Sequence, residues 1–324
     1  MPLKYKQLPR PILVLSPMAD MTDQPFCRTV KKVVSDLVDE PRLIMFREMV
    51  SAEAVVRGND KTLRMAEFTD SERPIVQQIF GADPKSMADA ARIIEDKFRP
   101  DGIDINMGCP AYKITSSFNG AALMKDPDLA STIVREVKKA VSVPVSVKMR
   151  AGWSNPEGCI EFAPIIQAAG ADLISIHGRT KTQGYSGTAD REVIHRVRKL
   201  VTIPLLYNGD ILTWQDYFEA VDATECAGAL IARGALGNPW IFSQIELKLN
   251  DKTPISPTLA ERIDVVKHHL NLHLEHYGER SLPTFRKHLS WYFKSQPHFK
   301  QYKQRMMTTT SVDELNSILD EIQK

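Results

Sequence analysis

Eight short apolar runs alternate with longer amphipathic stretches along the first three quarters of the chain, and this alternation constrains the fold more than any other feature. The runs that read as strands are Ile12–Leu15, Leu43–Phe46, Ile75–Phe80, Gly102–Asn106, Val145–Lys148, Leu173–His177, Leu205–Asn208 and Ala229–Ala232. The amphipathic stretches with helical periodicity include Lys85–Phe98, Pro127–Ala140, Gly158–Ala169 and Arg191–Leu200. Strands and helices in strict alternation predict a parallel sheet, and eight such units predict a closed (β/α)8 TIM barrel.

The composition changes after Leu249, which suggests a second domain. The stretch "NDKTPISPT" at 250–258 carries two prolines among polar residues, as a linker does. Beyond it no strand pattern recurs, and the expected helices are Leu259–Tyr277, Leu282–Ser295 and Val312–Ile322. We therefore expect a catalytic barrel over residues 1–249 and a small all-helical domain over residues 250–324.

Composition indicates an ordinary globular protein of the cytoplasm. Hydrophobic residues make up 43% of the chain and charged residues 25%. No apolar run approaches the roughly 20 residues that span a bilayer, and the segment up to Arg10 lacks the apolar stretch of a signal peptide. The four cysteines lie far apart, without the close pairs of metal sites or disulfide scaffolds. Because the formal net charge is only +2, a polyanionic partner would need a local basic surface.

The ends of the predicted strands carry polar residues or glycine almost throughout, and in a TIM barrel these ends form the active site. In chain order they are Pro17-Met18-Ala19, Glu48, Gln78, Asn106 with Cys109, Lys148 with Arg150, His177 with Arg179, Asn208-Gly209-Asp210 and Ala232-Arg233-Gly234. Loops after strands seven and eight commonly bind a phosphate through backbone N–H groups that small residues leave uncovered. "YNGDI" and "IARGALGNPW" supply such loops, so a phosphate-bearing cofactor fits. The amide of Gln78 and the ammonium of Lys148 suit the polar edge of a flavin ring, whereas "NGD" by itself is also compatible with a plain turn.

A thiol follows the fourth predicted strand, in the stretch "DINMGCP". Pro110 blocks a helix at this point and stiffens the loop that carries Cys109. Most free cysteines are simply small buried hydrophobic residues. That alternative suits Cys27 and Cys226 better than Cys109, because neither of them lies at a strand end.

Nine motifs occur in an order that resembles a known family. They are "SPMADMTDQPF", "REMVSA", "VQQIFGADP", "DINMGCP", "VKMRAGW", "IHGRTKTQGYSG", "YNGDI", "ARGALGNPWIF" and "KHLSWY". Together they cover nearly the whole chain and resemble the tRNA-dihydrouridine synthases, in particular the bacterial B-type branch. The resemblance implies that Cys109 is the catalytic acid, that Asn106 contacts the target base, and that Lys113 and Arg179 contact tRNA. It also implies contacts to flavin mononucleotide (FMN) from Pro17, Met18, Ala19, Gln78, Lys148, His177, Asn208, Gly209, Asp210, Ala232 and Arg233.

The implied reaction explains why a thiol is needed. The family reduces the C5=C6 bond of uridines in the D-loop of tRNA to 5,6-dihydrouridine, with FMN that is recharged by NADPH or NADH. Hydride reaches C6, which is conjugated to the C4 carbonyl, and C5 then needs a proton from the opposite face of the base. An unperturbed thiol has a pKa of about 8.5, so near neutral pH it is largely protonated and can still donate its proton. A serine hydroxyl is too weak an acid for this role.

Two departures from the family pattern concern phosphate binding. Ser116, Ser117 and Phe118 occupy a stretch where relatives often carry further basic residues. "ARG" at 232–234 replaces the commoner "GRG", which is harmless unless this position needs a positive φ.

The predicted helical domain contains a basic and aromatic segment. Arg280 to Arg305 holds seven Lys or Arg residues and no acidic residue, with six aromatic residues between them. This combination is typical of RNA binding, although a solvated basic face over an aromatic core is the alternative. We expect Arg286, Lys287 and Lys294 to face outward, with Arg286 and Lys287 in contact with tRNA. Trp291 and Phe293 are expected to pack inward.

Four histidines at helical spacing, His268, His269, His273 and His276, lack an accompanying carboxylate or thiol, so we expect no metal site.

Two other functions compete with this interpretation. One is a flavin barrel that acts on a small pyrimidine or enone, similar to dihydroorotate dehydrogenase, which would leave the basic tail unexplained. The other is an RNA-binding barrel without catalysis, which the combination of Cys109, Lys148 and His177 disfavours. We expect tRNA as the partner of a monomeric enzyme, with no membrane contact and no obligate protein partner.

Overall fold

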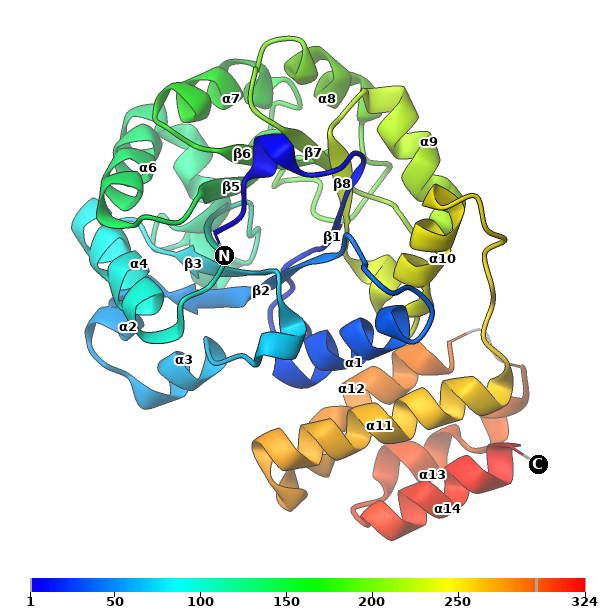
Figure 1. The fold of residues 1–324 in the computed structure, drawn as a ribbon. Helices are drawn as coiled ribbons and strands as arrows, with labels where there is room; N and C mark the ends of the chain where they lie inside the picture. Colours follow the sequence, from blue (N-terminus) through cyan, green and yellow to red (C-terminus); the bar gives the residue numbers. More distant parts are fainter. Residues whose placement is uncertain (1, 295–296, 324) are drawn as a thin grey trace. The chain divides into compact units, whose positions relative to one another are not determined.

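A computed structural model of the chain describes residues 2–294 and 297–323. Eight parallel strands close a barrel in the order of the sequence (Figure 1). The strands are β1 (Ile12–Leu15), β2 (Ile44–Ser51), β3 (Ile75–Phe80), β4 (Gly102–Met107), β5 (Val145–Arg150), β6 (Leu173–His177), β7 (Leu205–Asn208) and β8 (Gly228–Ile231). The predicted TIM barrel with helices after it is therefore confirmed.

Helices alternate with the strands and continue after the last one. Those up to residue 249 are α1 (Gln24–Ser35), α2 (Ala52–Val56), α3 (Asp60–Met65), α4 (Pro84–Phe98), α5 (Tyr112–Thr115), α6 (Pro127–Ala140), α7 (Gly158–Ala168), α8 (Arg191–Arg198), α9 (Trp214–Thr224) and α10 (Trp240–Leu249). The later ones are α11 (Leu259–Tyr277), α12 (Leu282–Tyr292), α13 (Lys303–Thr308) and α14 (Val312–Gln323). The predicted end of α12 at Ser295 lies outside the described residues, and α13 was not predicted.

Helix starts follow from local capping chemistry. The Asp83 side chain accepts a hydrogen bond from the N–H of Ser86 at 2.8 Å, and Pro84 occupies the first turn of α4. Asp126 caps α6 in the same way, again followed by proline. A side-chain acceptor for the unpaired N–H groups, with a proline that needs no partner, specifies a helix start. Figure 1 shows α4 and α6 on the outside of the strand ring.

The barrel interior is apolar at the N-terminal end of the strands and polar at the other end. The apolar cluster contains Leu3, Tyr5, Ile12, Val14, Ile44, Phe46, Val76, Leu173, Leu206 and Leu230. Two residues further along the strands, on the same face, come Glu48, Gln78 and Asn208. One end of the interior thus closes the barrel by hydrophobic packing, and the other end is free for chemistry.

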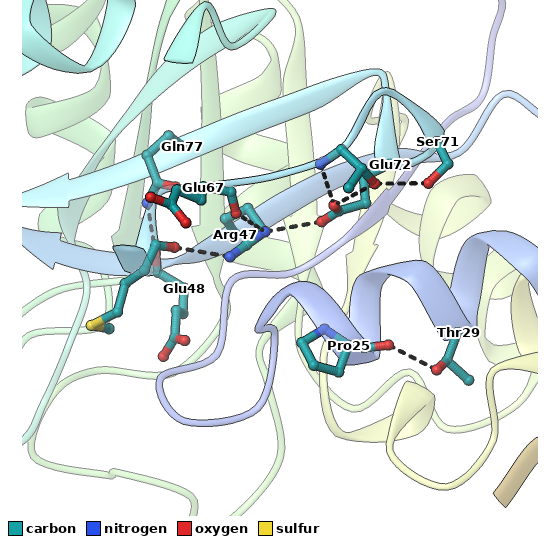
Figure 2. Close-up of polar contacts among 10 residues, drawn as sticks. Pro25, Thr29, Arg47, Glu48, Glu67, Ser71, Glu72 and Gln77 are labelled. Carbon is teal, nitrogen blue, oxygen red and sulfur yellow. Dashed lines mark hydrogen bonds and ion pairs between the residues drawn. The ribbon is translucent and has the colours of Figure 1, made fainter. Parts of the chain in front are cut away.

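On the outer face of β2, Arg47 anchors the segment that leads to β3 (Figure 2). Its guanidinium lies 2.9 Å from the carboxylate of Glu72, and both side chains are at most 1% exposed. It also donates to the backbone carbonyls of Glu67 at 3.0 Å and Met65 at 2.9 Å. The ion pair is therefore fully buried and surrounded by hydrogen bonds.

The chain divides into two compact units. One comprises the chain up to Asp23 together with Arg42–Ala232, and the other comprises Gln24–Pro41 together with the chain from Arg233 onward. The second unit has a core of its own, built from Ile263, Val266, Leu270, Phe285, Leu289, Leu315, Ile318 and Leu319 among others. The domain boundary between residues 249 and 250 remains a prediction. Within residues 2–294 and 297–323, no helix has both the length and the hydropathy required to span a membrane.

Candidate active site

The turn after β4 is held by hydrogen bonds on three sides. The side-chain oxygen of Asn106 accepts from the N–H of Cys109 at 2.9 Å and from that of Gly108 at 3.1 Å. The carbonyl of Gly108 accepts from Arg150 Nε at 2.8 Å. The carbonyl of Cys109 accepts from the N–H of Ala121 at 3.1 Å. The thiol therefore projects from a rigid backbone, because the Asn106 side chain folds back onto the turn and accepts its N–H groups.

A buried hydrogen-bond chain lies behind Asn106. Its amide nitrogen donates to the side-chain oxygen of Gln78 at 2.7 Å, and the amide nitrogen of Gln78 donates to Asp104 at 2.6 Å. Ser146 donates to the other oxygen of Asp104 at 2.6 Å. Burial raises the pKa of Asp104 to about 6, although the bonds from Ser146 and Gln78 oppose this shift. Since an amide has two donors and two lone pairs, Gln78 retains one of each for a ligand.

Lys148 and Asn208 meet across the barrel interior. Lys148 Nζ donates to the side-chain oxygen of Asn208 at 3.1 Å, and the Asn208 amide nitrogen donates to the carbonyl of Leu230 at 3.0 Å. Burial lowers the pKa of Lys148 to about 8, and the positive charge of Arg150 acts in the same direction. Ser175, paired with Lys148 in the strand register, has a buried hydroxyl with no hydrogen-bond partner among the described residues. The Lys148 ammonium and the Ser175 hydroxyl could therefore donate hydrogen bonds to the polar edge of a ligand.

The thiol of Cys109 is kept protonated at neutral pH. Burial raises the pKa of Cys109, while a backbone hydrogen bond from Ala111 and the charges of Arg150 and Lys148 oppose the rise. Cys109 is only partly buried, whereas Cys27 and Cys226 are buried, as expected for small hydrophobic residues. The thiol can therefore supply a proton to a group that approaches it.

The loop after β1 carries the predicted flavin contacts Pro17, Met18 and Ala19. The N–H of Met18 donates to the hydroxyl of Thr22 at 2.9 Å. The N–H of Asp20, which has a left-handed φ of 62°, donates to the Glu48 carboxylate at 2.8 Å. Burial raises the pKa of Glu48, and the Asp20 hydrogen bond opposes this shift. Glu48 was recognised only as a polar strand end, because its loop partner is distant in sequence.

Arg179 ties together the loops after β6 and β7. Its guanidinium forms two hydrogen bonds to the Asp210 carboxylate, at 2.8 and 2.7 Å, and Nε donates to the carbonyl of Ser186 at 3.1 Å. Asp210 also accepts from the N–H of Ala189 at 2.8 Å. Both charged groups thus fix loops around the barrel mouth. The tRNA contact by Arg179 and the flavin contact by Asp210 remain predictions.

The remaining predicted cofactor residues lie at strand ends as expected. Gly209 has φ +141°, and a Cβ there would lie 2.4 Å from the Cβ of Ala189, so only glycine fits. His177 is buried at the end of β6. Ala232 does not have a positive φ, so an alanine is unstrained at this position. Arg233 belongs to the second unit, and its contact to a phosphate remains a prediction.

In the tail, Arg286 is partly exposed, and its guanidinium makes contacts that the sequence did not indicate. Its guanidinium donates to the backbone carbonyls of Thr309 at 2.6 Å and Thr308 at 3.0 Å, where α13 ends. Carbonyls at a helix end lack partners within the helix, and a cation there is stabilising. Phe293 is buried and Lys294 is exposed, as expected. Lys287 and Trp291 are partly exposed.

The histidines of α11 and α12 belong to an aromatic cluster. The ring of His269 lies 4.5 Å from that of His288 and 5.0 Å from that of Phe285. Its Nδ1 is 3.0 Å from the hydroxyl of Tyr292. In the described part of the chain, no group of three or more His, Cys, Asp or Glu residues is arranged to hold a metal ion.

Comparison with known proteins agrees with this geometry. The family model for dihydrouridine synthase (Dus) matches residues 14–324. The chain is 36% identical to a probable tRNA-dihydrouridine synthase 1 from Synechocystis, over 94% of this chain and 84% of that protein. It is also 36% identical to tRNA-dihydrouridine synthase B from Pasteurella multocida, over 89% of this chain and 86% of that protein.

Among solved structures, histamine dehydrogenase from Rhizobium sp. 4-9 superposes with a TM-score of 0.55. The two chains are 12% identical, and the match covers 81% of this chain and 49% of that one, so it supports the barrel fold alone. The family model and the two relatives extend over nearly all of this chain, including the turn that carries Cys109. The resemblance inferred from the motifs is thereby confirmed, and the chain belongs to the tRNA-dihydrouridine synthases of the dihydrouridine synthase family.

Proposed function

We propose that this protein is an FMN-dependent enzyme that reduces the C5=C6 bond of D-loop uridines in tRNA to 5,6-dihydrouridine. The observation that carries the proposal is the rigid turn of Asn106 and Cys109, whose protonated thiol lies at the polar end of the barrel near Lys148 and Arg150. This arrangement offers a general acid beside a set of donors that fits a flavin.

The residues of the barrel interior fit FMN. Lys148 keeps donors beyond its bond to Asn208, and Gln78 keeps a donor and a lone pair. The hydroxyl of Ser175 has no partner in the part of the chain that the structure describes. When bound and reduced by NADPH or NADH, FMN would supply the hydride that C6 of the uracil accepts. The other residues proposed to hold it are Pro17, Met18, Ala19, His177, Asn208, Gly209, Asp210, Ala232 and Arg233.

Cys109 supplies the second half of the reduction. Once C6 has gained a hydride, C5 carries enolate character, and the thiol donates its proton there. Asn106 holds the base and, through its side-chain oxygen, the backbone of Cys109. The thiolate left behind is stabilised by the charges of Arg150 and Lys148, which lower the pKa of Cys109 against the effect of burial. Solvent then returns the proton.

tRNA is the proposed substrate, bound by the basic residues of both parts of the chain. Lys113 is exposed four residues after Cys109, and Lys287 lies in the basic segment of the tail. The free thiols of all four cysteines fit an enzyme that works in the reducing cytoplasm, and we propose that it acts as a monomer without an obligate protein partner.

The test starts from purified protein. It should be yellow and release FMN on denaturation, and with NADPH it should form dihydrouridine in unmodified tRNA, detected by mass spectrometry. Activity on free uridine or a small enone but not on tRNA would favour the small-molecule flavin enzyme. RNA binding without reduction would favour the non-catalytic barrel. A colourless protein that cannot be reconstituted with FMN would contradict the proposal.

A further inference from the structure

Two exposed tyrosines lie on segments that are linked to the turn carrying Cys109. Tyr112 is 83% exposed and Tyr185 is 61% exposed. Tyr112 follows Cys109 by three residues, on α5. Tyr185 follows Gly184, whose carbonyl accepts from Arg150 at 3.0 Å. Because the same guanidinium also holds Gly108 at 2.8 Å, one buried arginine fixes both segments next to the thiol.

Two lysines are held against a third aromatic ring. Lys125 Nζ lies 4.6 Å and Lys181 Nζ 4.4 Å from the ring centroid of Trp153. Lys125 is also 5.7 Å from the ring of Phe118, a residue held at φ 59°. The two loops are joined by backbone bonds, from Lys181 to the carbonyl of Gly152 at 2.9 Å and from Thr182 to that of Trp153 at 3.0 Å. Cation–π attraction thus orders two ammonium groups in advance of any ligand.

Among the described residues, Lys113, Lys125 and Lys181 form no ion pair with a carboxylate. Lysines elsewhere on the barrel do, for example Lys85 with Asp89 and Lys139 with Glu136. We name this surface the basic–aromatic rim. It consists of Tyr112, Lys113, Phe118, Lys125, Trp153, Lys181 and Tyr185.

We propose that the basic–aromatic rim binds the RNA strand on either side of the target uridine. Lys125 and Lys181 contact phosphates, and the rings of Tyr112 and Tyr185 stack on the neighbouring bases. Ordered cations with exposed rings match a single strand whose bases are unstacked, as a uridine drawn into the barrel requires. The stretch 116–118 carries no charge, so the lysines supply the charge complementarity at this side of the mouth. The inference rests on the proposed function, because it assumes an RNA substrate.

The test removes the two ordered cations and keeps their side-chain length. Lys125→Gln with Lys181→Gln should weaken binding of unmodified tRNA and lower the slope of log affinity against log salt by about 1.4, at about 0.7 per single-strand phosphate. Lys85→Gln with Lys139→Gln is the matched control, since it removes the same charge from paired lysines and should leave the slope unchanged. Flavin content and melting temperature are measured for each variant.

A second pair of variants separates ordering from charge. Trp153→Leu keeps both lysines but removes the ring, and we expect about ten-fold weaker tRNA binding, whereas Trp153→Phe should stay within about three-fold of wild type. Equal salt-dependence slopes for the two lysine double variants, or wild-type tRNA affinity of Trp153→Leu, would overturn the proposal that the basic–aromatic rim binds RNA. If wild-type protein still formed dihydrouridine in that case, the proposed function would stand. Wild-type protein that neither bound nor modified tRNA would overturn both.

Discussion

The side-chain oxygen of Asn106 accepts a hydrogen bond from the backbone N–H of Cys109 at 2.9 Å. An amide proposed to contact the base thus also fixes the turn that aims the thiol. Its nitrogen is committed to Gln78 at 2.7 Å, so the side chain cannot rotate without breaking the chain that ends at Asp104. Asn106 therefore links the proposed base contact, the acid Cys109 and the predicted flavin contact Gln78.

Asn106→Ala should disorder the thiol and leave the barrel folded. Two N–H groups of the turn lose their acceptor, and positioning of this kind is commonly worth about 10²-fold in rate. We expect reoxidation of reduced flavin by tRNA to slow by about that factor. Alkylation of Cys109 by iodoacetamide should also change in rate, with Cys109→Ala as the blank because the other cysteines are buried. Wild-type values for both quantities would contradict the role of Asn106.

Cys109→Ala should separate the two half-reactions. The variant should keep its flavin and its reduction by NADPH, because neither involves the proton for the base. Oxidation of the reduced flavin by tRNA should slow by about 10²- to 10⁴-fold, as expected for a lost general acid, and Cys109→Ser should be nearly as slow. The measurement is flavin absorbance under anaerobic conditions after addition of unmodified tRNA. If the alanine variant reoxidises as fast as wild type, another group is the acid.

Arg286 and Lys287 are adjacent but should respond differently to substitution. Arg286→Ala removes two hydrogen bonds to carbonyls at the end of α13 and should lower the free energy of unfolding by about 1–3 kcal/mol. Lys287→Ala should cost less stability than Arg286→Ala. It should instead reduce the slope of log tRNA affinity against log salt by about one unit. Thermal melts and salt titrations distinguish the two, and identical behaviour would show that the residues share one role.

The ion pair of Arg47 and Glu72 should be far more sensitive to truncation than an exposed pair. Arg47→Met leaves the carboxylate of Glu72 buried without its partner and should cost about 3–5 kcal/mol of stability. Arg57→Ala, which breaks the exposed pair with Glu53, is the control and should cost less than about 1 kcal/mol. Urea denaturation measures both. Equal small losses would mean that the 57–73 segment is not anchored by Arg47.

Much of the fold was predictable because it is encoded locally. β1, β3, β6 and β7 have the predicted bounds, since apolar runs and polar ends are properties of a few consecutive residues. The polar strand ends were also visible, because the barrel brings them to one mouth. β2 extends five residues beyond its predicted end, because polar Arg47 and Glu48 belong to a strand whose inner and outer faces both bind polar partners.

What could not be predicted is which polar groups pair with each other. Arg179 and Asp210 lie 31 residues apart in two loops, and nothing in either loop indicates their bidentate contact. The contact of Arg286 with the end of α13 could not be predicted, because helical periodicity gives the direction of a side chain but not the presence of α13 nearby. The pKa of Cys109 likewise depends on the charges of Arg150 and Lys148, which come from another strand.

The last prediction concerns Lys148, whose pKa burial lowers to about 8. A lowered pKa means that the ammonium is charged below pH 8 and neutral above it. Any step that uses the ammonium should therefore weaken as the pH rises through about 8, before the thiol of Cys109, whose pKa is raised by burial, loses its proton. Lys148→Arg keeps a positive charge at higher pH, so the loss near pH 8 should move upward or vanish. Lys148→Met should show the weakened rate at every pH. The rate of flavin reoxidation by tRNA, followed between pH 6 and about 10, measures this, and an unchanged loss near pH 8 in the arginine variant would exclude Lys148 as its origin.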